Sequence, residues 1–596
     1  MNLPPFHTLT IAEKVAQLIV VRASGHLFDR QICYPQWEAC QSDLQTWIDQ
    51  GVGGVILLGG SAAELALRTQ QLQTWSKIPL FLAADVEEGV GQRFAGASWL
   101  PPPLAFGSIA RANLAQGLAD VEAFGEITAQ EARAIGLNWI LAPVVDVNNN
   151  PLNPVINVRS FGETPEEVCV LTQAFLRGCQ RHSVLTTAKH FPGHGDTAVD
   201  SHLESPQILH DRSRLEAVEW KPFRTAIEAG VSSIMTAHLL LPALDAEYPA
   251  TLSRPILTNL LRESWHFEGL IVTDALIMQA ITQHYGETEA PLLALEAGAD
   301  VILMPVNPTK TIEAMVEAVH RGRLLETRID QSLARIWKAK RSLKTIAEPI
   351  SQRLDSLERS PGDGLTRSIL KRSQRIRFSS SSPQGMDPAR PNQTLHQPAN
   401  PSPQMGQMGQ MGKLPDCRNL ILVDNLLQVP FLGNHTPAVR IPQKHGYHLQ
   451  ILDQTSYPLP HIQPHIQPNI QPNIQPNLTP NPHGQSYSPT DGSPTLLQLF
   501  VRGNPFRGSG ETSPWMQQWL IALLEVKQLQ ALIVYGSPYA WESLIAHFPP
   551  KIPSIFTYGQ MPLSQEIALQ TLFDRLFETG LGQNKTSTLN PIEFTT

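Results

Sequence analysis

One short segment of this 596-residue chain concentrates side chains that can transfer protons. Residues 186–202 read TTAKHFPGHGDTAVDSH and hold the polar residues Lys189, His190, His194, Asp196, Asp200 and His202. The glycines and the proline among them predict an irregular loop rather than a helix or strand. Asp200 and His202 are two residues apart, so the carboxylate can orient the imidazole and stabilise its protonated form. This pair is therefore a candidate general acid/base.

A second candidate is a single carboxylate within apolar chain. Asp274 follows the apolar residues 270–273 and precedes Ala275, Leu276 and Ile277. An unpaired charge in such surroundings costs several kcal/mol or more, so it needs a compensating role. Two roles fit the residues: a catalytic carboxylate at a strand end, or a buried aspartate that caps the following helix.

Further polar residues follow other apolar runs. Asp85 and Arg93 follow residues 80–84, Asp146 and Arg159 follow residues 139–145, and His238 ends residues 233–238. A metal site built from His190, His194 and Asp196 is disfavoured because no HExxH pattern is present and Lys189 would repel a cation. We therefore predict no metal and no other cofactor.

The elements that must position these residues alternate between strand and helix. Eight strands are predicted at residues 18–22, 52–58, 80–84, 139–145, 185–189, 233–238, 270–273 and 301–304. Helices are predicted between them at residues 62–75, 165–182, 212–230, 255–265 and 311–320. Eight such repeats favour an α/β fold of the (β/α)8 barrel type over a doubly wound sheet, and barrel active sites form at the carboxyl ends of the strands.

The second half of the chain contains two segments of biased composition. Residues 349–415 are rich in Ser, Pro, Gln and Gly and predict a disordered linker, while residues 457–489 repeat HIQP-like units that predict an extended spacer. Apolar strands at 419–424, 496–503, 531–538 and 553–559 predict an α/β sandwich. We therefore divide the chain into a barrel (1–348), a linker (349–415) and a smaller sandwich domain (416–596) that the repeat interrupts. Every candidate site residue lies in the barrel, so the sandwich is not expected to contribute to the site.

Composition excludes several classes of protein. The net charge of −8 gives no electrostatic reason to expect nucleic acid or an anionic membrane surface. We find no transmembrane segment and no signal peptide. The five cysteines lack a CxxC spacing and are too few for a disulfide scaffold. A cytoplasmic protein is expected.

The motifs described above resemble those of a known family. The run KHFPGHGDTAVDSH is similar to the signature of the bacterial β-N-acetylglucosaminidases of glycoside hydrolase family 3, and NPVINVRSFG and GLIVTDALIM resemble two further motifs of that family. Glu88 and Val90 depart from the family pattern, as does Asn157, which stands where glycine is usual. The resemblance covers roughly residues 8–345.

The resemblance implies a retaining exo-hydrolase that removes terminal β-linked N-acetylglucosamine through a covalent glycosyl-enzyme. It assigns Asp274 as nucleophile, His202 as acid/base and Asp200 as the partner of that histidine. It also assigns Asp85, Arg93, Arg159, Lys189 and His190 to substrate binding. The implied substrate is a GlcNAc-terminated oligosaccharide or muropeptide, consistent with cell-wall recycling, and no protein partner is indicated.

Several alternatives remain open at this stage. A histidine acid/base does not repel an incoming anion, so phosphate could replace water and the enzyme could be a phosphorylase. An exo-β-glucosidase or xylosidase of the same family is the nearest other enzyme. A different class is an inactive carbohydrate-binding or scaffold protein, against which the complete set of Asp274, Asp200 and His202 argues.

Overall fold

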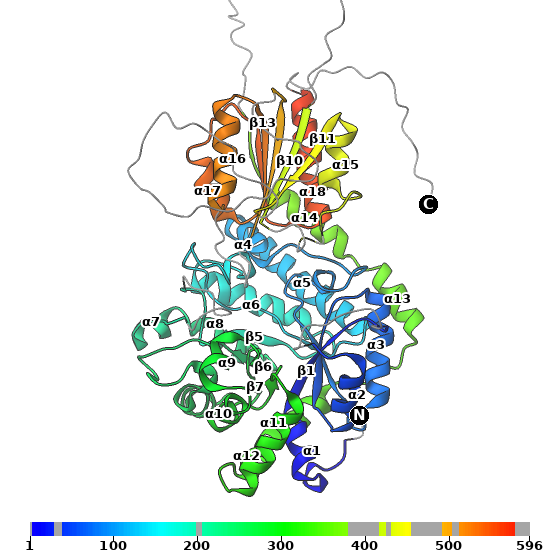
Figure 1. Ribbon diagram of the computed structural model, residues 1–596, viewed down its shortest axis with the longest axis vertical. Helices are drawn as coiled ribbons and strands as arrows, with labels where there is room; N and C mark the ends of the chain where they lie inside the picture. The colour runs from blue at the N-terminus through cyan, green and yellow to red at the C-terminus, as the bar shows by residue number, and fades with distance from the viewer. Residues whose placement is uncertain are drawn as a thin grey trace, which may run out of the picture.

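The computed structural model describes residues 3–28, 38–197, 206–378, 417–424, 429, 431–454, 492–502 and 512–578. Two bodies built around separate parallel sheets are visible in Figure 1, the larger below and the smaller above. The larger contains the N-terminal residues, coloured blue to green, and the smaller contains most of the C-terminal residues, coloured yellow to red. Among the described helices, none is both long and apolar enough to cross a lipid bilayer.

The larger body is the predicted eight-stranded barrel. All neighbouring strands are parallel, in a five-stranded sheet of order β4-β3-β2-β1-β8 and a three-stranded sheet β5-β6-β7. Parallel bridges from Trp139 to Leu185 and from Val272 to Val301 join the two sheets and close the barrel. The strands are β1 (Ile19–Ser24), β2 (Gly54–Leu58), β3 (Phe81–Ala84), β4 (Trp139–Ile140), β5 (Thr187–Phe191), β6 (Ser233–Thr236), β7 (Leu270–Val272) and β8 (Ile302–Leu303).

Helices surround this barrel and bury their apolar faces against it. They are α1 (Ile11–Ala16), α2 (Gln41–Asp49), α3 (Ala62–Trp75), α4 (Pro103–Ala112), α5 (Leu114–Ala134), α6 (Pro165–Cys179), α7 (Arg212–Ala217), α8 (Lys221–Glu228), the π-helix η5 (Pro255–Ser264), α9 (Gln279–Tyr285), α10 (Glu289–Ala297), α11 (Pro308–His320) and α12 (Glu326–Ser342). Short 3-10 turns are η1 (Phe6–Thr8), η2 (Val90–Gln92), η3 (Asn157–Arg159) and η4 (Ala250–Leu252). The helix predicted at 212–230 is divided in two, because Pro222 favours the first turn of a new helix, where its missing N–H is not needed.

The smaller body is the predicted α/β sandwich. Its strand order is β11-β10-β12-β13-β14-β9, with β9 antiparallel at one edge. The strands are β9 (Arg375–Arg377), β10 (Cys417–Val423), β11 (Tyr447–Leu452), β12 (Thr495–Val501), β13 (Leu529–Gly536) and β14 (Ser554–Thr557), and the helices are α15 (Pro437–Lys444), α16 (Pro514–Glu525), α17 (Pro538–Ile545) and α18 (Pro562–Glu578). Figure 1 shows α16 and α17 on one side of the sheet and α15 and α18 on the other.

The two faces of this sheet follow from the alternation of side chains along its strands. In β13, Leu532 and Val534 pack into the core shared with α16 and α17, whereas Ile533 and Tyr535 pack into the core shared with α15 and α18. Because both faces are covered at β13, residues 531–535 of this strand are apolar without alternation. The sequence analysis missed β11 and the edge strand β9.

The predicted start of the linker at residue 349 is wrong. Residues 350–377 form α13 (Ile350–Glu358), α14 (Gly362–Ser373) and β9, in place of a disordered segment. The reason is a small set of apolar residues at helical spacing, of which Leu357, Ile369 and Leu370 are buried. Averaged composition hid this pattern, because the Ser, Pro and Gln bias begins after it. Residues 379–415 and the repeat at 457–489 lie outside the described residues.

Candidate active site

Lys189 is the central cation of a buried charged cluster at the carboxyl ends of the barrel strands. It lies on β5, and its Nζ is 2.7 Å from Asp85 Oδ1 and 2.6 Å from Glu87 Oε1, both in the loop after β3. The Lys189 side chain is only 2% exposed, whereas that of Asp85 is one-third exposed. Asp85 is therefore the solvent-accessible partner of Lys189. The backbone carbonyl of Asp85 accepts a hydrogen bond from Arg93 Nε at 2.9 Å, which places Arg93 beside the same loop.

Arg159 joins the cluster from the loop that follows β4. Its Nε and Nη2 donate to the two oxygens of Glu87 at 2.7 and 2.8 Å, a bidentate pair, and its Nη1 donates to the carbonyl of Val155 at 2.9 Å. Arg159 Nη2 is also 3.4 Å from His190 Nε2. Three of the predicted substrate-binding residues, Arg159, Lys189 and His190, are therefore brought together.

The charges of this cluster determine its protonation. Burial by itself would raise the pKa of Glu87, but the adjacent charges of Arg159 and Lys189 outweigh burial and hold that pKa well below its ordinary value. Burial would lower the pKa of Lys189, but Asp85 and Glu87 together raise it above its ordinary value. Glu87, Lys189 and Arg159 therefore stay ionised and offer fixed hydrogen-bond donors and acceptors.

His190 and His194 share one buried carboxylate. Asp146 accepts hydrogen bonds from His190 Nδ1 at 2.8 Å and from the backbone N–H of His194 at 2.7 Å. Burial would raise the pKa of Asp146, but the hydrogen bond from His190 reverses this effect and the pKa is lowered. Burial lowers the pKa of His194 to about 4, so that ring is neutral at neutral pH. The Asp146 bond fixes the tautomer of His190, with Nε2 facing Arg159.

Asp274 lies immediately after β7 and is half-buried. Its Oδ1 accepts a hydrogen bond from the backbone N–H of Ala275 at 2.7 Å. The neighbouring carbonyl of Ala275 accepts from His238 Nε2 at 3.1 Å, which links the ends of β6 and β7. The next helix, α9, has Met278 as its N-cap, so Asp274 does not cap it. The helix-cap interpretation of Asp274 is therefore wrong.

Two predicted residues cannot be placed. Asp200 and His202 lie outside the described residues, as does the whole segment 198–205. Two residues that the site assignment omitted prove central: Glu87, which binds both cations, and Asp146, which orients His190. The spacing of Asp85 and Glu87 could have indicated the first, since alternate residues of extended chain point to one side. Asn157 has φ 42°, a left-handed conformation that asparagine tolerates better than most residues, which explains how it replaces a glycine.

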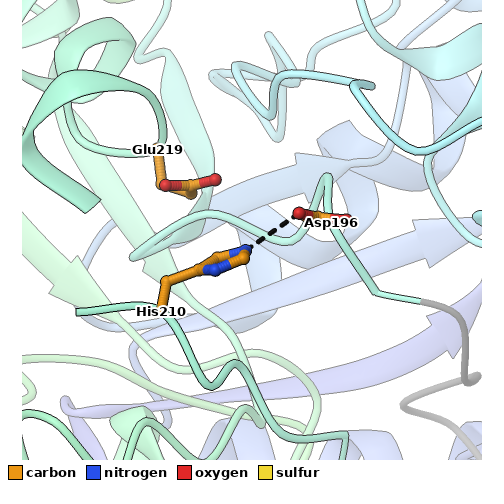
Figure 2. Close-up of side chains that lie close together, drawn as sticks. All are labelled: Asp196, His210 and Glu219. Carbon is orange, nitrogen blue, oxygen red and sulfur yellow. Dashed lines mark hydrogen bonds and ion pairs between the residues drawn. The ribbon is translucent and has the colours of Figure 1, made fainter. Parts of the chain in front are cut away.

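A second polar cluster lies beside the site, formed by Asp196, His210 and Glu219. Figure 2 shows the three side chains pointing toward one another, with His210 Nε2 2.8 Å from Asp196 Oδ2. Arg214 Nη2 lies 3.2 Å from Glu219 Oε1 and 3.5 Å from Asp196 Oδ2. The guanidinium of Arg214 therefore already balances the negative charge of these two carboxylates. Among the described residues, the ligand atoms of His190, His194 and Asp196 do not form one group: Asp196 Oδ2 bonds to His210, His190 Nδ1 bonds to Asp146, and His194 Nδ1 lies 2.9 Å from Thr197 Oγ1.

The fold and this cluster together define a (β/α)8 barrel protein with a charged site at the strand ends, followed by an α/β sandwich domain. Residues 10–339 match the family described as "Glycosyl hydrolase family 3 N terminal domain", and residues 410–574 match the "Bacterial Glycosyl hydrolase family 3 C-terminal domain". The first match covers more than half of the chain. The chain belongs to glycoside hydrolase family 3.

Individual relatives are similar to this chain over about half of its length or over nearly all of it. Beta-hexosaminidase A of Pseudoalteromonas piscicida is 34% identical over 347 residues, which are 51% of this chain and 58% of that protein. The match thus spans little more than half of that relative. A beta-hexosaminidase of Thiobacillus denitrificans is 33% identical over 47% of this chain and 79% of its own length. The solved structure of a family 3 beta-N-acetylglucosaminidase from a Paenibacillus species has a TM-score of 0.67 and 26% identity, with 95% of this chain and 96% of that one covered.

Proposed function

We propose that this protein is a retaining exo-β-N-acetylglucosaminidase. The observation that carries the proposal is the buried cluster of Lys189, Arg159 and Glu87, and in the sequence Lys189 begins the motif that also contains Asp200 and His202. Its ionised side chains offer fixed hydrogen-bonding groups at the carboxyl ends of the strands, where barrel enzymes bind their substrates. The names of the relatives support N-acetylglucosamine as the sugar that is released.

In the proposed mechanism Asp274 attacks the anomeric carbon while His202 donates a proton to the leaving oxygen. The bond to the aglycone breaks, and the sugar becomes covalently attached to Asp274. His202 then removes a proton from water, which attacks the same carbon and releases the sugar with retained configuration. Asp200 orients His202 and stabilises its protonated form. Asp85, Arg93, Arg159, Lys189 and His190 hold the sugar hydroxyls during both steps.

Muropeptides are the proposed substrates, and cell-wall recycling is the proposed process. The cytoplasm is the proposed compartment, which the low number of cysteines and the lack of a CxxC spacing support. The proposed substrate depends on the natural aglycone, and the proposed process and compartment depend on the cell. Their tests are therefore separate from the test of the reaction.

The decisive assay compares a chromogenic N-acetyl-β-glucosaminide with the matching β-glucoside, each with and without inorganic phosphate. Preferential turnover of the N-acetylglucosaminide without phosphate supports the proposal. Preference for the glucoside identifies a glucosidase instead, and dependence on phosphate identifies a phosphorylase. No turnover of either substrate by well-folded protein indicates a binding or scaffold protein.

The nucleophile is tested with Asp274→Asn, which keeps the shape of the side chain but removes the attacking charge. Turnover is expected to fall by orders of magnitude while the protein remains folded. Asp355→Asn is the matched control, because it removes one exposed carboxylate on α13, a helix that follows the barrel in the chain and carries none of the candidate site residues. A variant Asp274→Asn that keeps more than about a tenth of wild-type kcat, a change of only ~1.4 kcal/mol, is not consistent with a nucleophilic role.

The acid/base pair is tested through the leaving group. His202→Ala is expected to slow both steps, and substrates whose leaving group needs no proton should restore the first step. Asp200→Ala should act in the same direction but more weakly. Equal losses on good and poor leaving groups in the His202 variant would show that this residue binds the sugar rather than transferring protons.

A further inference from the structure

The sandwich domain reaches the candidate site through one arginine. Arg502 directly follows β12 of the sandwich, and its Nη2 forms an ion pair with Oε1 of Glu88, in the barrel loop after β3. The Glu88 side chain is 1% exposed, so this contact is fully desolvated on the barrel side. The expectation that the sandwich contributes nothing near the site is therefore wrong for this loop.

Glu88 is itself a structural centre of the loop. Its Oε2 accepts a hydrogen bond from Trp99 Nε1 at 3.0 Å, and its carbonyl accepts from the N–H of Leu100 at 2.8 Å. The preceding residue, Glu87, holds both Arg159 and Lys189. Glu88, which binds Arg502 of the sandwich domain, is thus joined by one peptide bond to Glu87, which binds the cations Arg159 and Lys189.

A tyrosine makes a similar connection to the other site loop. Tyr539 is the second residue of α17, and its hydroxyl accepts from Asn148 Nδ2 at 2.7 Å and donates to Glu163 Oε1 at 2.7 Å. Asn148 lies two residues after Asp146, and Glu163 lies four residues after Arg159. One hydroxyl therefore ties together both ends of the loop that carries Arg159.

We propose that Arg502 and Tyr539 are positioning residues of the active site, through which the sandwich domain holds the two barrel loops that carry the sugar-binding side chains. This inference rests on the proposed function, because it takes Lys189 and Arg159 as sugar ligands. Neither residue touches the reacting atoms. Each acts through a barrel residue, Arg502 through Glu88 and Tyr539 through Asn148 and Glu163.

The physical consequence of losing either contact is a displaced loop. Arg502→Ala leaves Glu88 as a buried carboxylate without its guanidinium, so the loop has to move to hydrate it. A displacement of about 1 Å in positioned groups can cost about a hundredfold in rate. We therefore expect kcat/KM on a chromogenic N-acetylglucosaminide to fall about tenfold, with most of the change in KM because the affected residues bind the sugar in ground and transition states alike.

The test compares Arg502→Ala, Arg502→Lys and Tyr539→Phe with a matched control. Arg372→Ala breaks another ion pair between the C-terminal half and the barrel, from Arg372 Nη1 to Asp120 Oδ2 at 2.8 Å, but Asp120 lies on α5 and not in a site loop. The control is expected to keep wild-type KM. Arg502→Lys, which retains the charge, should recover part of the loss, and Tyr539→Phe should raise KM without changing the packing of its ring.

Hydrogen exchange supplies a readout that does not depend on activity. Arg502→Ala should speed exchange in a peptide covering residues 85–100, where the N–H groups of Gly91 and Leu100 are bonded within the loop, and Arg372→Ala should not. Wild-type protein that fails to cleave the substrate overturns the proposed function, and faster exchange in the Arg502 variant would still show that the loop is held. Unchanged KM and unchanged exchange in both Arg502→Ala and Tyr539→Phe overturn the inference.

Discussion

Removing the charge of Glu87 is the most direct test of the buried cluster. Glu87→Gln keeps the size of the side chain and one accepting oxygen, but it leaves Arg159 and Lys189 without the carboxylate they share. Three contacts are affected, at 2.6, 2.7 and 2.8 Å, and the Glu87 side chain is 5% exposed. Water cannot replace the lost charge at such a position.

The size of the effect follows from burial. Breaking a buried ion pair by removing one partner costs about 3–5 kcal/mol, because the remaining charge stays desolvated. Asp85 still contacts Lys189, and the Gln oxygen still accepts one bond, so we expect a loss near ~3 kcal/mol and a fall in Tm of about 5 °C or more. The displaced cations should also reduce kcat/KM on an N-acetylglucosaminide by at least about tenfold.

A second carboxylate offers the matched control. Glu289 also binds an arginine with both oxygens, to Arg323 at 2.6 and 2.9 Å, but the two side chains are 46% and 39% exposed. Glu289→Gln is expected to cost less than about 1 kcal/mol. Thermal unfolding followed by circular dichroism compares the two variants at one pH and scan rate. Equal Tm shifts for Glu87→Gln and Glu289→Gln would refute the argument from burial, and an unchanged KM in the former would remove Glu87 from the site.

Three further predictions concern single side chains. Burial lowers the pKa of Lys340 to about 7, so between pH 7 and 10.5 the unfolded chain binds more protons than the folded protein and stability rises with pH. Lys340→Met should therefore raise Tm more at pH 6.5 than at pH 10. Equal Tm shifts at the two pH values would contradict this prediction. Burial lowers the pKa of His194 to about 4, so stability should fall by up to about 3 kcal/mol as pH drops from 6.5 to 4. His194→Asn should flatten that part of a plot of Tm against pH, and an unchanged slope would exclude His194 as its source. Asn157 has φ 42°, and its buried side-chain amide atoms have no hydrogen-bond partner within the described parts of the chain. Asn157→Gly removes this amide, so it should raise the free energy of unfolding by about 1 kcal/mol, as measured by denaturant titration. A lower midpoint would show that the amide makes a necessary contact.

The barrel strands and the polar residues at their ends could be predicted from the sequence. Each strand is a short apolar run, and this signal is local, so all eight predicted runs overlap observed strands. Asp85 and Asp274 follow such runs directly, Arg159 lies in the loop after one, and Lys189 is the last residue of the predicted run 185–189. Parallel strands of a barrel end at one face, so their common location was predictable too. The helices α13 and α14 were not predicted, because a few buried leucines and isoleucines are hidden in a segment of biased average composition.

What the sequence alone determined is therefore the barrel and the set of residues at its carboxyl end, because periodicity and short motifs act over neighbouring residues. Only the tertiary structure decided which of these residues pair. Glu87 binds Arg159, 72 residues away, and Arg502 binds Glu88 across 414 residues. Such contacts depend on closing the barrel and docking the sandwich against it, and no local pattern specifies the result. The physical reason is that a buried charge must find its partner in space, wherever the folded chain brings one within reach.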